Sequence, residues 1–140
     1  MNYYRPRFFQ LSELVDPILL TQYGDKCWNF LDARMLWTID QLRLKFGMCI
    51  INGVYQGRRY TESGLRRFDT PTGAKMSAHK LGKGFDLKFT GSTAEGIRLD
   101  MQANPKLDAY KFITRCERDT SWLHIDNFNA FSTGIMFIRP

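Results

Sequence analysis

The chain has 140 residues, with 20 Lys and Arg against 14 Asp and Glu, and a formal net charge of +6. This length predicts a single domain over residues 1–140, because domains commonly hold about 100–150 residues. With 44% hydrophobic residues the chain can bury a core, which excludes a disordered protein. It has no apolar run near the ~20 residues of a membrane span, so we expect no membrane insertion.

The positive charge is concentrated in one stretch of the chain. Residues 58–88 hold eight Lys and Arg and three acidic residues, and so carry five of the six net positive charges. Clustered basic residues are typical of proteins that bind phosphate backbones. A nucleic-acid binder would show steeply salt-dependent DNA binding that survives His79→Ala. We expect no nucleic-acid partner, because the same stretch carries the motif described below.

The first half of the chain predicts two helices and a strand. A short first helix is bent or split by Pro17. Apolar residues at spacings of four and three predict a helix over residues 30–46, which Gly47 ends. A buried strand follows over 48–51. The Gly-rich and charged segment 53–83 is expected to be mostly loop.

The second half predicts a small sheet with a helix inserted. Alternating apolar and polar residues predict a strand over 84–89, with Asp86 and Lys88 on its polar face. Ser92, followed three residues later by a glutamate, is a capping box that opens a helix over 93–101. The remaining expected elements are a helical turn toward Tyr110, strands over 112–117 and 122–128 joined by a tight turn, and a final strand over 135–138. Together they predict an α+β fold, a small antiparallel sheet with flanking helices.

The cysteines and the N-terminal residues indicate the cellular compartment in which the protein is made. Cys27, Cys49 and Cys116 are far apart and form no CxxC pair, which argues against a sulfur-based zinc site. We interpret Cys49 and Cys116 as small core residues, and unpaired thiols suit a reducing compartment. No apolar segment follows Arg5 and Arg7, so we expect cytoplasmic synthesis without a signal peptide.

The two histidines of the chain both have carboxylates near them. His79 precedes Asp86 by seven residues, on a Gly-punctuated turn before a strand. In the second segment, alternation places Trp122, His124 and Asp126 on one face of a strand. Two imidazoles and one carboxylate would give a metal ion three ligands and leave a fourth position open. This is the pattern of catalytic zinc sites rather than of closed structural ones.

These segments resemble a known family. Residues 77–86, SAHKLGKGFD, match the signature SxHxxGxAxD of the zinc D-Ala-D-Ala carboxypeptidases and L-alanyl-D-glutamate endopeptidases, except that Gly84 replaces the usual alanine. Residues 63–66, SGLR, are similar to the SGxR segment of that family, and residues 122–126 are similar to the segment that supplies its last zinc ligand. The resemblance covers residues 30–128 in the expected order. It implies the fold that these enzymes share with the hedgehog signalling domain.

The resemblance also implies a metal and a set of roles. One Zn²⁺ per chain would be held by His79, Asp86 and His124. Arg66 would bind a substrate carboxylate or the developing oxyanion, since a guanidinium offers a planar fork of donors. Ser77 would either hydrogen-bond substrate or orient the turn.

The resemblance leaves alternatives for the residue that contacts substrate and for the general base. Trp122, on the expected metal face, is a candidate for substrate contact. Many members have a glutamate three residues before the last histidine ligand, where this chain has Ser121. The alternatives for the base are Glu117, Asp119 and Asp126. Glu117 shares the face of the second histidine if the hairpin loop has two or four residues, and points away if it has three. Asp126 is equally a candidate for orienting a ligand.

The function expected from these features is a zinc metallopeptidase that hydrolyses an amide bond in bacterial peptidoglycan stem peptides. A short catalytic domain of this kind resembles a phage-type lysin, which acts on the cell wall after release or as part of a virion. The alternative is a non-enzymatic virion or binding protein that retains the zinc site. Ser121 in place of the glutamate supports that alternative.

Overall fold

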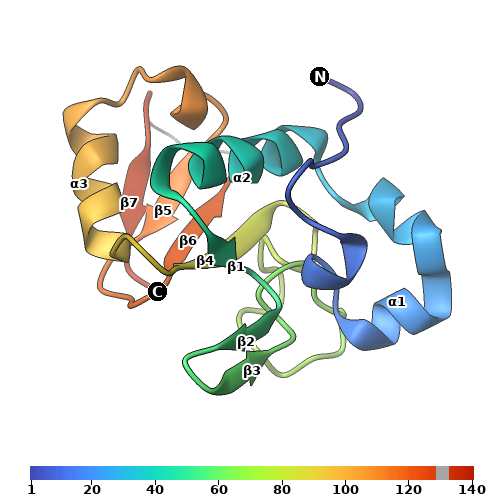
Figure 1. Cartoon of the computed structure of the whole chain (residues 1–140). Helices are drawn as coiled ribbons and strands as arrows, with labels where there is room; N and C mark the ends of the chain where they lie inside the picture. The colour runs from blue at the N-terminus through green and yellow to red at the C-terminus, as the bar shows by residue number, and fades with distance from the viewer. Residues whose placement is uncertain (129–132) are drawn as a thin grey trace.

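The computed structural model describes residues 1–128 and 133–140. Helices come first and the sheet follows, with an α-helix and a 3-10 helix inserted between two of its strands (Figure 1). The elements in chain order are η1 (Leu11–Glu13), α1 (Pro17–Tyr23), η2 (Gly24–Phe30), α2 (Ala33–Phe46), β1 (Cys49–Ile50), β2 (Gly53–Tyr55), β3 (Arg58–Tyr60), β4 (Gly84–Phe89), α3 (Ala94–Ala103), η3 (Asp108–Tyr110), β5 (Arg115–Glu117), β6 (Leu123–Asp126) and β7 (Met136–Ile138), where η marks a 3-10 helix.

The main sheet has five strands in the order β1-β4-β6-β5-β7. The pairs β1–β4, β4–β6 and β5–β6 are antiparallel, as expected, whereas β7 runs parallel to β5. The expected α+β class is therefore confirmed, and the sheet is mixed because of its last strand. The register of β4 and β6 pairs Asp86 directly with His124, so two of the expected ligands lie side by side.

The starts of the first two α-helices follow from local capping. Pro17 does split the first helical segment, because α1 begins at this residue and the carboxylate of Asp16 accepts a hydrogen bond from the amide of Ile18. The helix expected over 30–46 begins three residues later, at Ala33, because Asp32 is its N-cap. It ends at Gly47 as expected, with φ of 88°.

Two local predictions need correction. The segment expected to be mostly loop contains the hairpin β2–β3, whose two turn residues Gln56 and Gly57 both have positive φ, at 49° and 77°. The cap of α3 is Thr93, which accepts from the amide of Gly96, rather than Ser92. The hydroxyl of Ser92 instead donates to the carbonyl of Phe46, at the end of α2.

A hydrophobic core lies between the helices and one face of the sheet. Met35, Ile39, Phe85, Ile97 and Ile125 belong to it, and they come from α2, β4, α3 and β6. Figure 1 shows α2 crossing this part of the sheet. The core residues of β4 and β6 alternate with the candidate ligands, which therefore project to the other face.

The second face of β4 is also covered. All six residues of β4 are buried, so the polar face on which Asp86 and Lys88 lie is covered as well as the apolar one. The segment 61–83 covers Asp86 and Lys88 and carries His79. Cys49 and Cys116 are buried free thiols, as predicted, and burial raises the pKa of both to about 12. Among the described helices, none is long and apolar enough to cross a membrane.

Candidate metal centre

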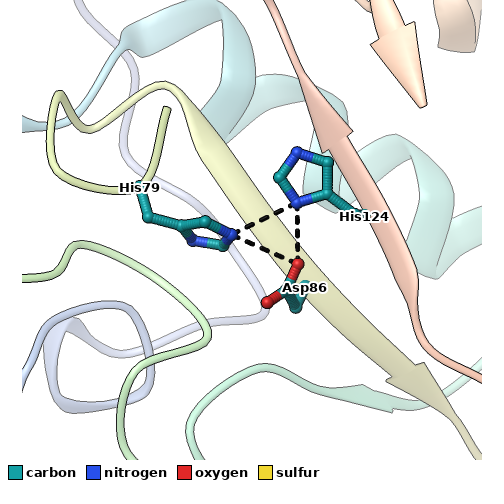
Figure 2. A group of neighbouring side chains, drawn as sticks. All are labelled: His79, Asp86 and His124. Carbon is teal, nitrogen blue, oxygen red and sulfur yellow. Dashed lines mark hydrogen bonds and ion pairs between the residues drawn. The ribbon is translucent and has the colours of Figure 1, made fainter. Parts of the chain in front are cut away.

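The three predicted ligands meet in one buried group. Figure 2 shows His79 reaching from its loop, Asp86 from β4 and His124 from β6 toward a common point. The Nε2 atom of His79 lies 3.2 Å from Nδ1 of His124 and 3.2 Å from Oδ1 of Asp86. The Nδ1 atom of His124 lies 2.8 Å from the same carboxylate oxygen. One donor atom from each residue therefore faces the other two.

His79 is oriented by the backbone. Its Nδ1–H donates to the carbonyl oxygen of Gly64 at 3.0 Å, which leaves the lone pair of Nε2 for the site. Gly64 has to be glycine, because a Cβ there would lie 2.1 Å from the carbonyl oxygen of Leu14. That same oxygen accepts from the amide of Leu65 at 2.8 Å. The N-terminal segment thus positions the carbonyl that orients His79.

His124 is oriented by a carboxylate. Its Nε2 lies 3.0 Å from Oδ2 of Asp126, a residue with no exposed surface. Arg115 donates to both carboxylate oxygens of Asp126, at 2.9 and 2.8 Å. Burial raises the pKa of Asp126, but the bonds from His124 and Arg115 outweigh it and hold this pKa below its usual value. Burial also lowers the pKa of His124, but bonds to Asp126 and Asp86 outweigh it and raise this pKa to about 9.

Asp86 divides its two oxygens between the imidazoles and a guanidinium. Oδ1 faces His79 and His124, and Oδ2 accepts from Nη2 of Arg66 at 3.1 Å. Burial raises the pKa of Asp86, but the nearby histidines outweigh it and hold this pKa well below its usual range. Arg66 is itself largely buried and donates through Nε to the carbonyl of Glu62. A guanidinium cation therefore lies directly beside the expected ligands and is paired with one of them, Asp86.

The donor set fits zinc. Tetrahedral zinc with bonds of about 2.0–2.1 Å separates its ligand atoms by about 3.3 Å, close to the spacing of the three donors. Each imidazole has its other nitrogen occupied by an acceptor, as in most metal-binding histidines. Without a cation, two imidazole lone pairs and an ionised carboxylate would face one another in a buried space, which is unfavourable. Either a metal ion or a proton on His124 removes this conflict.

The four residues of the SGLR segment all support the site. Ser63 accepts a hydrogen bond from Nζ of Lys88 at 2.8 Å, and Lys88 also donates to the carbonyl of Ile51 at 2.7 Å. Gly64 binds His79, and Leu65 bridges to the N-terminal segment at Val15. Burial lowers the pKa of Lys88 to about 8. The sequence alone did not single out Lys88, because an alternating lysine is normally solvated.

Of the three candidates for the general base, Glu117 comes from β5, which flanks β6 on the side away from β4. The register pairs Arg115 with Asp126 and Cys116 with Ile125, and alternation along β5 places Glu117 on the same face as Arg115. The connection between the strands is not the tight turn expected, since residues 118–122 separate them. Glu117 is half-buried at the end of β5, and its negative charge contributes to the raised pKa of His124.

The other two candidates for the base have different surroundings. Asp119 is exposed, with φ of 64°, in the connection between β5 and β6. Asp126 has both oxygens engaged by Arg115 and His124, which matches the orienting role considered for it. The amide of Phe128 also donates to Oδ1 at 3.1 Å, so each oxygen of Asp126 accepts two hydrogen bonds.

Two of the three expected substrate contacts, Ser77 and Trp122, form no hydrogen bond with the ligand group in the part of the chain that the structure describes, whereas the third, Arg66, pairs with Asp86. The hydroxyl of Ser77 accepts from the amide of Lys80, within the turn that presents His79, so it orients that turn. Trp122 is 38% exposed, just before β6. Its side chain makes no hydrogen bond within the described residues, and its carbonyl accepts from Arg98 at 2.8 Å.

Arg98 is a buried residue that sequence reasoning missed. It lies on α3 and is 2% exposed. Its guanidinium donates to the carbonyls of Glu117, Thr120 and Trp122 at 2.7–2.8 Å. One arginine therefore holds both ends of the β5–β6 connection. No sequence signal marks it, because an arginine on a helix is usually solvated.

Comparison with known proteins identifies no relative. No family model, no curated protein and no solved structure matches this chain.

Proposed function

We propose that this protein is a zinc-dependent peptidase that hydrolyses an amide bond in bacterial peptidoglycan stem peptides. The observation that carries the proposal is the buried group of His79, Asp86 and His124, with one donor atom of each facing a common point. The choice of substrate rests on the resemblance of residues 63–66 and 77–86 to the peptidoglycan peptidases.

Zinc, when bound by these three residues, supplies a Lewis acid that polarises a carbonyl and lowers the pKa of water toward ~7. Asp126 keeps His124 in the tautomer that leaves Nδ1 free to bind. Arg66 lies beside the candidate ligands, with its guanidinium 3.1 Å from Asp86. From this position it donates to the substrate carboxylate or to the oxyanion. Glu117 takes the proton from the attacking water as general base.

The biological setting follows from the same proposal. A peptidase of this kind acts on the cell wall, either after its release as a lysin or as a component of a virion. Its cleavage position is either D-Ala-D-Ala or L-Ala-D-Glu.

The test is amine release from purified peptidoglycan by the zinc-loaded protein. We expect new amino groups that disappear with a chelator, and the masses of the fragments identify which of the two bonds is cut. Glu117→Gln should retain stoichiometric zinc and lower turnover by roughly 10²–10⁴-fold, the usual loss when acid–base catalysis is removed. Asp119→Asn is the matched control and should leave turnover unchanged.

Two results would contradict the proposal. Stoichiometric zinc binding without amine release would favour the non-enzymatic alternative, which Ser121 in place of the family's glutamate supports. Retention of stoichiometric zinc by His124→Ala would overturn the ligand set.

A further inference from the structure

A cavity of about 370 Å³ adjoins the candidate metal centre. Arg66 belongs to both, because its guanidinium binds Asp86 and its side chain also lines the cavity. Lys80, which directly follows the ligand His79, lines the cavity as well. A molecule that occupies this cavity would therefore lie beside the metal ligands, with Arg66 between them. We refer to it as the Lys80 cavity.

The wall of the Lys80 cavity is largely apolar and open to solvent. Tyr23, Phe30, Phe68 and Leu81 contribute to it, and they are 47%, 43%, 64% and 38% exposed. Tyr23 and Phe30 stack edge to face, with ring centroids 5.5 Å apart. Several large apolar side chains that converge on one hollow are typical of a ligand site rather than of an ordinary protein surface.

The charged residues that line the Lys80 cavity are all basic. Arg66, Arg67 and Lys80 line it, and its lining includes no Asp or Glu. The two arginines have carboxylate partners, since Arg66 pairs with Asp86 and Arg67 pairs with Asp16 at 3.3 Å.

Lys80 has no such partner. It is 4% exposed, and its Nζ donates to the carbonyl of Thr70 at 3.3 Å. Within the described residues no carboxylate lies within 4.0 Å of this amine. Lys80 therefore adds to the lining of the cavity one positive charge that no carboxylate of the described residues pairs with.

We infer that the Lys80 cavity binds a carboxylate carried on an apolar body. A single ammonium group without a counter-ion fits one negative charge, and the apolar wall fits the rest of the molecule. The assignment of this ligand to the substrate, as the part of the stem peptide that extends past Arg66, rests on the proposed function. The binding itself does not need the metal.

The test compares a carboxylate with its uncharged analogue. N-benzoyl-D-alanine and its primary amide are titrated into the full ¹⁵N-labelled chain, once zinc-loaded and once metal-free, and backbone amide shifts are recorded. We expect the acid to move the amides of Phe68 and Leu81 in both forms of the protein. N-benzoyl-D-alanine amide, the uncharged ligand, should bind at least about tenfold more weakly than the acid, because it loses a charge-assisted hydrogen bond.

Variants test whether the amine of Lys80 causes the preference for the acid over the uncharged ligand. Lys80→Gln should bind acid and amide equally, whereas Lys106→Gln, an exposed lysine beyond α3, should keep the wild-type preference. Equal affinity of the wild type for acid and amide, or shifts confined to other surfaces, would overturn the inference. If Lys80→Gln does not fold, the two ligands on the wild type still decide. If the carboxylate binds but no amine is released from peptidoglycan, only the proposed function is contradicted. If amine is released but the carboxylate does not bind, only the inference about the Lys80 cavity is contradicted.

Discussion

At the scale of single residues, each candidate ligand is held by a partner that leaves one donor atom free. His79 gives its Nδ1–H to a backbone carbonyl, and His124 gives its Nε2–H to a buried carboxylate. A carbonyl can only accept, and Asp126 is held ionised by Arg115, so both tautomers are determined by neighbours. The site is therefore organised for a cation before any cation arrives.

The raised pKa of His124 predicts a pH-dependent stability in the metal-free protein. His124 titrates near 6.5 when unfolded and at about 9 when folded, so its contribution is complete below pH 6.5 and is lost as pH rises toward 9. We expect the free energy of unfolding to fall by about 1–2 kcal/mol between pH 5.5 and 8, measured by urea denaturation with EDTA.

The control for this prediction is the zinc-loaded protein. A bound metal replaces the proton on His124, so zinc affinity should rise with pH over the same range. Measurements stop at pH 8 because Lys88, whose pKa falls to about 8 on folding, adds stability above that value and opposes the trend. Equal stability of the metal-free protein at pH 5.5 and 8 would contradict the prediction.

Gly84, where the signature that this segment resembles has alanine, is closely packed in a way that can be tested. A Cβ at Gly84 would lie 2.9 Å from the Cβ of Ala78 and 3.4 Å from Cε1 of His124. Gly84→Ala should therefore destabilise the protein by about 1–3 kcal/mol, as measured by thermal or urea unfolding. Ala78→Gly combined with Gly84→Ala should recover part of this loss. A fully stable Gly84→Ala single variant would show that the strand moves freely at this point.

At the scale of elements, the N-terminal segment supports the candidate metal centre through Gly64. Because a Cβ at Gly64 would meet the backbone of Leu14, Gly64→Ala should displace the carbonyl that orients His79. We expect zinc affinity to fall by roughly 10–100-fold, the usual effect of losing a partner that orients a ligand. Gly91→Ala is the matched control, since a Cβ there meets no atom within 4 Å. Equal zinc affinity of the two variants, measured by competition with a chelator, would contradict this role.

The same elements show what the sequence could predict. Strand β4 was predicted with its observed bounds, and the grouping of His79, Asp86 and His124 was predicted from alternation along the strands and from the resemblance. The hairpin β2–β3 was missed because its strands have three residues each and its Gln56-Gly57 turn lacks the usual Asn or Asp. Arg98 and Lys88 were missed because burial of a charge depends on partners distant in sequence, and local pattern favours solvent for both.

At the scale of the whole molecule, the basic stretch is not a surface patch. Of the eight Lys and Arg in residues 58–88, Arg58, Arg59 and Lys75 are exposed, whereas Lys80 and Lys88 are buried. The remaining basic residues are half-buried, and Arg66 among them is paired with Asp86. A phosphate backbone needs accessible cations, so the net charge of the stretch overstates its capacity for nucleic acid. Most of this charge instead surrounds the candidate ligands and the Lys80 cavity.

Because the ligands come from a loop and from two strands, zinc should stabilise the fold as a whole. A ligand at one hundred times its Kd adds about 2.7 kcal/mol to the free energy of unfolding. For a chain of this length that corresponds to a rise in Tm of roughly 10 °C, measured by calorimetry with and without EDTA. Mg²⁺ should give no shift, since it prefers six oxygen ligands, and His124→Ala should remove the response to zinc. An equal Tm of the wild type with and without zinc would contradict a shared metal site. Ligands from three separate segments cannot bind one ion without holding those segments together.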